Sequence, residues 1–196
     1  SSAASDVYKR QVFADAVERL MVLGSAGRDV AAFLHASYPD EALDILTHTA
    51  DGGLTSLRAN PLKGTPEALC EKLLASGAKT AAPGLVPGSV LACFEGSPAE
   101  SGLFREGYFH VEGQASQLAA LCVEAKPGDT VLDLCAAPGG KSLLLIEEMQ
   151  DEGRLVSCDV SENRVQLIRK AVERMGFAHV EPRVSDGTKA DADLPM

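Results

Sequence analysis

Small and acidic residues follow three apolar stretches in the last third of the chain. The first stretch, residues 130–134, leads into the loop Cys135, Ala136, Ala137, Pro138, Gly139, Gly140 and Lys141. Asp159 ends the second stretch, and Asp186 comes just after the third. Small residues let a backbone approach a ligand closely, and a carboxylate can accept hydrogen bonds from a ribose diol or an amino group. The pattern predicts a site for an adenosyl ligand.

These groups converge only if the surrounding elements alternate between strand and helix. The sequence predicts strands at 130–134, 154–159 and 179–184, with helices at about 141–150 and between 161 and 176. Ser161 is expected to cap the second helix and Gly176 to end it. This order is half of a doubly wound α/β sheet, in which ligands bind at the carboxyl ends of the strands.

A phosphate-binding loop is the main alternative for the same residues. Gly140-Lys141-Ser142 matches the end of a P-loop, but Cys135 stands where that motif needs a glycine. The loop also lacks the G-x-G-x-x-G order of dinucleotide-binding proteins. A carboxylate at Asp159 has no role in a P-loop, because it would repel nearby phosphates. A nucleoside-triphosphate-binding module is therefore our second hypothesis.

A family resemblance is carried by the loop and by two upstream segments. Residues 131–142, VLDLCAAPGGKS, resemble the first S-adenosylmethionine motif of the RsmB/Sun family of RNA 5-methylcytosine methyltransferases. Upstream, GYFHV and ASQL resemble the family segment that leads into that motif, and LRAN with LKG resembles the start of its small RNA-binding subdomain. The resemblance covers roughly residues 54–188.

The resemblance implies a cofactor, a substrate and a mechanism. Residues 135–141 would wrap the methionine part of S-adenosylmethionine, Asp159 would hold the ribose and Asp186 the adenine. Arg164 is included in this expected cofactor site, although a solvated surface arginine is the simpler interpretation. The implied substrate is cytosine in RNA, with ribosomal RNA favoured. A cysteine thiolate would add to C6 of the base before C5 takes the methyl group.

Two departures from the family pattern concern catalysis. The family usually has glutamine and then an acidic residue after Val111, where this chain has Glu112-Gly113-Gln114. The family's proline-cysteine motif does not occur in these 196 residues, and we expect the nucleophile to lie beyond Met196. The chain alone is then expected to be inactive. A non-catalytic RNA-binding fragment is the third hypothesis.

The expected architecture has three parts. A helical segment spans 1–53, a small α+β RNA-binding subdomain spans 54–108, and the Rossmann-like methyltransferase half-sheet spans 109–196. In the small subdomain, strands are expected at 54–60 and 89–94, with a helix that begins after Thr65. Arg58 and Lys63 are candidates for contacts with RNA phosphates.

Composition sets the remaining expectations. The formal net charge is −10, but residues 56–112 carry five basic and six acidic side chains, so an RNA site would have to be local. Apolar residues make up 45%, with no run long enough to span a bilayer and no secretory signal. The five cysteines form no CxxC pair, and the four histidines have no ligand spacing. We expect a cytoplasmic protein without a metal site, monomeric when full length.

Overall fold

The computed structural model describes residues 13–50, 53–189 and 194. The expected turn at residues 51–52 and the last two residues of the chain lie outside the described residues. The chain divides into two compact units, Ser1–Gly53 and Leu54–Met196. Each unit has its own buried core and is described by itself.

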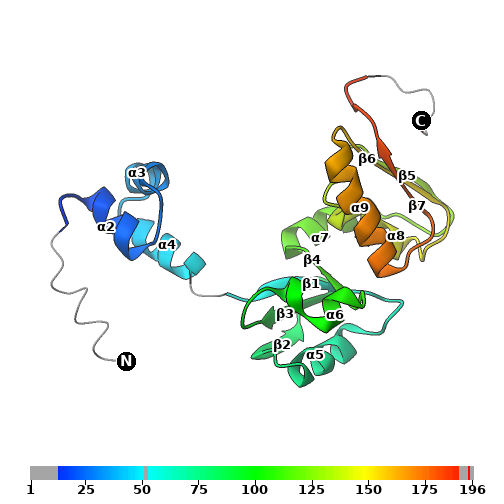
Figure 1. Ribbon diagram of the computed structural model, residues 1–196, viewed down its shortest axis with the longest axis horizontal. Helices are drawn as coiled ribbons and strands as arrows, with labels where there is room; N and C mark the ends of the chain where they lie inside the picture. The colour runs from blue at the N-terminus through cyan, green and yellow to red at the C-terminus, as the bar shows by residue number, and fades with distance from the viewer. Residues whose placement is uncertain (1–12, 51–52, 190–193, 195–196) are drawn as a thin grey trace. The chain divides into compact units, whose positions relative to one another are not determined.

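Residues 13–50 of the first unit form three short helices (Figure 1). These are α2 (Ala16–Leu23), α3 (Arg28–Ser37) and α4 (Ala42–Ala50). Asp15 caps α2, because its Oδ1 accepts the backbone N–H of Glu18 at 2.7 Å. The sequence predicts Pro39 as an early residue of the third helix in this segment, but that helix begins at Ala42. Pro39 lies instead in the turn before it, where the Ala42 N–H donates to Tyr38 O at 2.8 Å.

The second unit begins with a four-stranded antiparallel sheet in the order β2-β3-β1-β4. Its strands are β1 (Thr55–Ala59), β2 (Thr80–Pro83), β3 (Ser89–Cys93) and β4 (Phe109–Val111). Its helical segments are α5 (Pro66–Ala75), η1 (Pro98–Glu100) and α6 (Gly102–Arg105). Thr65 caps α5, as the sequence predicted, by accepting the N–H of Ala68. Leu57, Leu73, Val90 and Phe109 are fully buried in this core.

Strand β4 belongs to the sheet of the small subdomain, whereas the expected boundary at residue 109 placed it in the methyltransferase region. We placed residue 109 at the start of the methyltransferase region, but Phe109 pairs with Ala59 of β1 in the small sheet. The physical reason is the apolar Phe109 ring, which packs edge-on against Phe104 with centroids 5.7 Å apart. Helix α7 (Gln114–Leu121) follows β4 and contacts α8 of the next layer.

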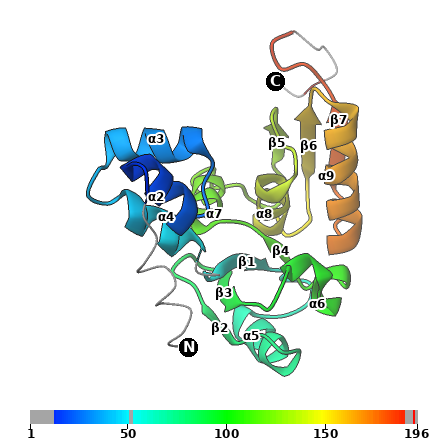
Figure 2. The same cartoon turned by 60° about the vertical axis from the view of Figure 1, so that its left-hand side comes forward.

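A three-stranded parallel sheet, ordered β5-β6-β7, forms the rest of the second unit. Its elements are β5 (Thr130–Asp133), α8 (Gly140–Glu148), β6 (Arg154–Asp159), α9 (Glu162–Met175) and β7 (Val180–Val184). Figure 2 shows α8 and α9 beside these strands. This arrangement confirms the predicted Rossmann-like α/β class.

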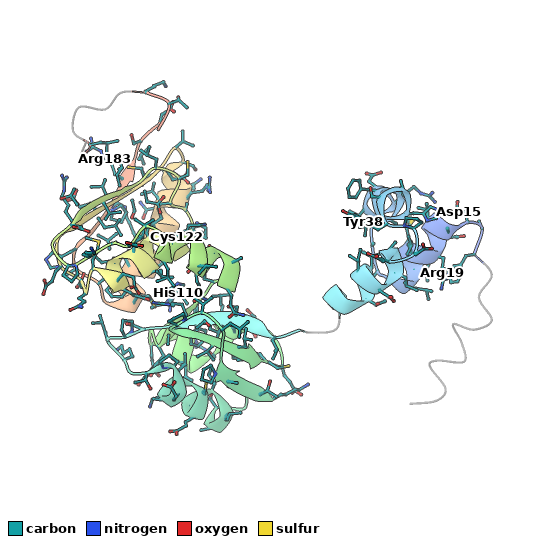
Figure 3. All side chains as sticks on the ribbon, turned by 180° about the vertical axis from the view of Figure 1, so that it is seen from behind. Asp15, Arg19, Tyr38, His110, Cys122 and Arg183 are labelled. Atoms are coloured by element: carbon teal, nitrogen blue, oxygen red, sulfur yellow. The ribbon has the colours of Figure 1, made fainter. Side chains whose placement is uncertain are left out.

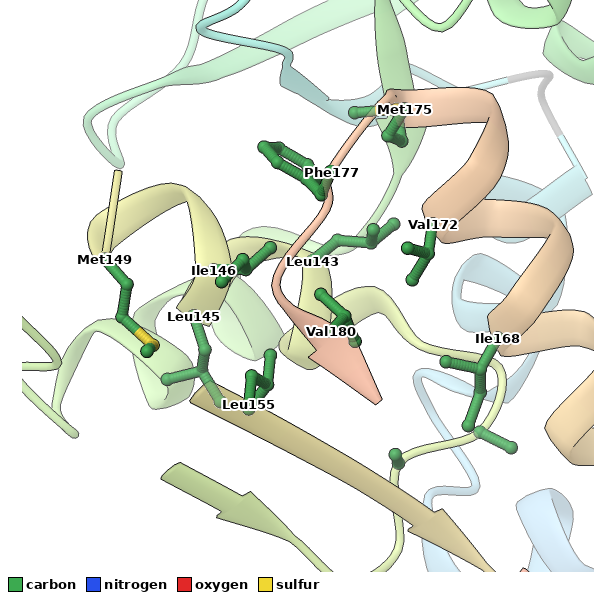
Figure 4. Packing of buried hydrophobic residues seen from close by; sticks show 12 residues of the cluster. Leu143, Leu145, Ile146, Met149, Leu155, Ile168, Val172, Met175, Phe177 and Val180 are labelled. Atoms are coloured by element: carbon green, nitrogen blue, oxygen red, sulfur yellow. The ribbon is translucent and has the colours of Figure 1, made fainter. Parts of the chain in front are cut away.

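The core of this layer comes from the apolar stripes that the sequence displays (Figure 4). Four apolar residues of α9 recur at a spacing of three or four, which predicts a buried face, and all four are buried, namely Val165, Ile168, Val172 and Met175. Gly176 ends α9 in the left-handed conformation at φ +85°. Ser161 occupies the N-cap position, but its side chain makes no capping hydrogen bond, so that detail of the prediction is wrong. Its backbone N–H instead donates to Asp159 Oδ1 at 3.1 Å.

Buried polar contacts join the small sheet to the methyltransferase layer. Arg58 of β1 pairs with Glu147 and Glu148 of α8, and only 6% of its surface is exposed. Arg58 is therefore not available for RNA phosphates, contrary to our expectation, whereas Lys63 is exposed. Asn60 Nδ2 donates to Gly107 O at 2.7 Å and to Met175 O at 2.8 Å.

Candidate cofactor-binding site

The loop after β5 is shaped by one glycine and by its neighbours in the sheet. Gly139 precedes α8 at φ +110°, a conformation that residues with a side chain rarely adopt. The Ala136 N–H donates to Cys158 O at 2.8 Å, and the Gly139 N–H donates to Ala136 O at 2.8 Å. These bonds hold the loop against the end of β6, where the first backbone N–H groups of α8 have no helical partner.

Asp133 braces the loop from the strand side. Its Oδ1 accepts the Cys135 N–H at 3.3 Å, and its Oδ2 accepts the Ser142 hydroxyl at 2.8 Å. The Ser157 hydroxyl in turn donates to Ser142 Oγ at 2.9 Å. Ser142 is fully buried and engaged in this chain. A P-loop needs that hydroxyl for a metal ion, so the geometry weighs against our second hypothesis.

The structure brings both acidic strand ends and the first loop residue, Cys135, to one cavity of about 380 Å³. Asp159, the last residue of β6, lines it together with Asp186, which follows β7. Cys135 lines it from the loop and Arg164 from α9. Three consecutive strand ends therefore meet at the carboxyl edge of the sheet, where ligands of doubly wound folds bind.

Asp159 and Arg164 form an ion pair at the wall of this cavity. Arg164 Nη1 lies 3.2 Å from Asp159 Oδ2, and Arg164 Nη2 donates to Ala137 O at 3.0 Å. The Asp159 side chain is 3% exposed, whereas that of Arg164 is 54% exposed. Arg164 thus ties the ribose-binding candidate to the loop, which the sequence could not show.

Asp186 keeps its charge through local partners. Its Oδ1 accepts the Thr188 hydroxyl at 2.6 Å and the Thr188 N–H at 3.1 Å, and Lys189 Nζ lies 2.9 Å from Oδ2. The Thr188 hydroxyl, followed by Lys189, lowers the pKa of Asp186 to about 2. This carboxyl group is therefore an acceptor at neutral pH.

A second cavity of about 180 Å³ lies next to the first, since Cys135 lines both. Its loop side consists of Cys135, Ala136, Ala137, Pro138, Gly140 and Lys141. Its opposite wall contains Glu112 and Ser116 from the small subdomain and α7. Sequence reasoning left any role of Glu112 in doubt, and only the contact between the small sheet and α8 brings it here. Two adjacent cavities, the first lined by two acids and the second by a lysine and two acids, fit an extended adenosyl amino acid.

The methyltransferase part matches a known family. Residues 120–195 match the family model described as 16S rRNA methyltransferase RsmB/F. These residues belong to the RsmB/F family. The RsmB/F assignment agrees with the resemblance carried by the loop sequence.

Relatives of known name extend the RsmB/F match upstream. The chain is 32% identical over 135 residues to the Bacillus subtilis "probable ribosomal RNA small subunit methyltransferase B", covering 69% of this chain and 30% of that protein. It is 31% identical over 93 residues to a Pyrococcus horikoshii tRNA (cytosine(72)-C(5))-methyltransferase, covering 47% and 24%. The matched part of the chain thus spans less than a third of the length of these relatives.

A solved structure shows the same fold. A methyltransferase homolog from Pyrococcus horikoshii superposes with a TM-score of 0.64 at 23% identity, covering 89% of this chain and 56% of that one. The fold of this chain therefore has an experimental counterpart.

Proposed function

We propose that this chain carries the cofactor-binding part of an S-adenosylmethionine-dependent RNA (cytosine-5) methyltransferase. The observation that supports it most is that Cys135, Asp159 and Asp186 line one cavity, while further residues of the same loop line an adjacent one. When bound, S-adenosylmethionine supplies an electrophilic methyl group. The residues of this chain bind and orient that molecule.

Each group of the site has a task in this proposal. Asp159 accepts hydrogen bonds from the ribose diol, and Asp186 accepts one from the adenine amino group. Residues 135–141 enclose the methionine end, and Lys141 faces its carboxylate. Arg164 positions Asp159 and the loop by bridging them.

The proposed chemistry needs a thiol from elsewhere. A cysteine thiolate forms a bond to C6 of cytosine, C5 becomes nucleophilic and takes the methyl group, and a base removes the C5 proton as the thiolate leaves. Cys70 and Cys158 are buried and Cys122 and Cys135 are exposed, but none of the five cysteines follows a proline as in the family's proline-cysteine motif. The proposal therefore places the nucleophile outside these 196 residues.

RNA is the proposed substrate, with small-subunit ribosomal RNA favoured by the RsmB/F match. The relatives carry names for both ribosomal RNA and transfer RNA, so the RNA class must be tested directly. We also propose that the protein acts in the cytoplasm as a monomer. No helix among the described residues is long and apolar enough to cross a membrane.

Calorimetric titration tests the cofactor proposal. The protein should bind S-adenosylhomocysteine and show little binding of ATP with magnesium. The opposite result would support the phosphate-binding alternative and overturn the assignment. The full-length protein, incubated with ribosomal RNA and with transfer RNA, should then transfer labelled methyl groups to cytosine in one of them.

A further inference from the structure

Glu112 is a buried carboxylate that the small subdomain contributes to the methyltransferase layer. It follows β4, and its backbone N–H donates to Ser56 O of β1 at 3.1 Å. Its side chain is 5% exposed and lines the smaller of the two adjacent cavities. A buried charge requires partners, and the structure supplies several.

The contacts of Glu112 keep the carboxylate charged and aim it at the start of α8. The Ser116 hydroxyl donates to Oε1 at 2.8 Å, and His110 Nε2 lies 3.2 Å from Oε2. A Cβ added to Gly140 would lie only 3.1 Å from Oε1. Burial acts to raise the pKa of Glu112, but the His110 and Ser116 hydrogen bonds and nearby Lys141 lower it overall.

The charges around this cavity suit a zwitterion. Asp133 also lines it, but its hydrogen bonds from Cys135 N and Ser142 Oγ hold together the loop and the first turn of α8 on its own side of the cavity. Each Glu112 oxygen likewise accepts one hydrogen bond, from Ser116 or His110, but a carboxylate has about four acceptor sites and can accept more. Glu112 lines the wall opposite the loop and can meet a cation there, whereas Lys141 can meet an anion. The amino acid end of the proposed cofactor carries one ammonium group and one carboxylate.

We propose that Glu112 binds the α-ammonium group of the cofactor's methionine end. This inference rests on the proposed function, since it assigns one atom of the ligand to one side chain. The small subdomain thereby completes the cofactor site, in addition to the strand ends and loop of the Rossmann-like sheet. The competing explanation is that Glu112 only holds His110 and the first residues of α8 in place.

Removal of the amino group from the ligand separates the two explanations. Calorimetry would compare S-adenosylhomocysteine with S-carboxypropyl-thioadenosine, which lacks only that amino group. The wild-type protein should prefer S-adenosylhomocysteine by about tenfold or more, as for a charge-assisted hydrogen bond. In Glu112→Gln that preference should largely disappear, because the amide carries no charge.

Several outcomes would overturn the inference. Equal binding of both ligands by the wild type, or an unchanged preference in Glu112→Gln, would show that Glu112 does not meet the ammonium group. If Glu112 has only a structural role, Glu112→Gln should instead weaken the binding of both ligands by the same factor. If the wild type binds neither ligand, the proposed cofactor itself is wrong, which is a distinguishable failure.

Two further variants complete the test, one as a control and one for the case in which Glu112→Gln does not fold. Glu181→Gln is the matched control, because Glu181 is an exposed glutamate that pairs with Arg154 at the opposite edge of the sheet. It should leave the preference intact. If Glu112→Gln does not fold, Glu112→Asp keeps the charge but withdraws it by one methylene, and it should reduce the preference; an unreduced preference would contradict the inference.

Discussion

Arg58 Nε and Glu147 Oε2 lie 2.7 Å apart in the interior, where β1 of the small sheet meets α8. Their side chains are 7% and 1% exposed, so each charge depends on the other for compensation. Arg58 also donates to Pro87 O, and its Nη2 lies 3.1 Å from Glu148 Oε1. Figure 3 shows His110 at this junction, where its Nδ1 lies 3.8 Å from Glu147 Oε1.

Arg58→Ala should strongly destabilise the second unit. The change leaves Glu147 buried without its main partner, and loss of one member of a buried pair costs roughly 3–5 kcal/mol. Burial already raises the pKa of Glu147. Urea unfolding followed by circular dichroism would measure the loss.

The matched control is Arg154→Ala. Arg154 makes a similar two-bond pair with Glu181, at 2.9 Å, but both side chains are about half exposed. Water replaces such a pair easily, so the control should change stability far less. An equal loss of unfolding free energy in both variants would show that burial does not increase the contribution of the Arg58 pair to stability.

Asp159→Asn should weaken S-adenosylhomocysteine binding by about 1.5–3 kcal/mol, the range for a hydrogen bond to a charged group. The carboxylate is buried at the wall of the larger cavity, so water screens it little. Calorimetry provides the measurement. Asp129→Asn is the control, because Asp129 is exposed in the turn before β5 and accepts the Lys126 N–H. A full-affinity Asp159→Asn variant would remove Asp159 from the proposed site.

The Asp186 carboxyl should titrate near pH 2 in the folded protein, which carbon-detected NMR can follow. Its depressed pKa means that the contacts with Thr188 and Lys189 stabilise the fold fully above the ordinary value of 3.8. That contribution is lost as the pH falls from there through about 2. Thr188→Ala removes the hydroxyl donor and should move the midpoint upward. An unmoved midpoint would mean that Thr188 is not the cause.

Gly107→Ala should loosen the junction between the small sheet and α9. Gly107 has φ +76°, and an added Cβ would lie 2.1 Å from Arg174 O, a backbone atom that cannot swing away. Gly128 shares a positive φ, +87°, but an added Cβ there meets nothing within 4 Å. Gly128→Ala should therefore cost only the backbone strain, about 1–2 kcal/mol, and Gly107→Ala clearly more. Thermal denaturation of both variants tests the order.

The Rossmann-like half was predictable because its signals are local. The apolar runs of β5, β6 and β7, the 3/4 spacing on α9 and the glycine at its end all act within a few residues. The structure also brings Asp159 and Asp186 to one cavity, because parallel strands present their carboxyl ends on one edge.

The rest depends on contacts between distant segments. Short strands β2 and β4 give little periodicity, and they form only by pairing with β3 and β1. Arg58 looks like a surface base in the sequence, yet its partner Glu147 is 89 residues away. Glu112 reaches the cavity wall only because the small sheet packs on α8, so no local pattern could reveal it.

The position of Val111 and Glu112 makes the small sheet part of the cavity wall. A ligand that fills this space therefore contacts the small sheet and α8 together. Part of its binding free energy then stabilises the packing of the small sheet on α8. By thermodynamic reciprocity, an RNA that shifts the small sheet changes cofactor affinity by the same factor by which the cofactor changes RNA affinity. In the proposed reaction, the contact between the small sheet and α8 thus links cofactor binding to RNA binding.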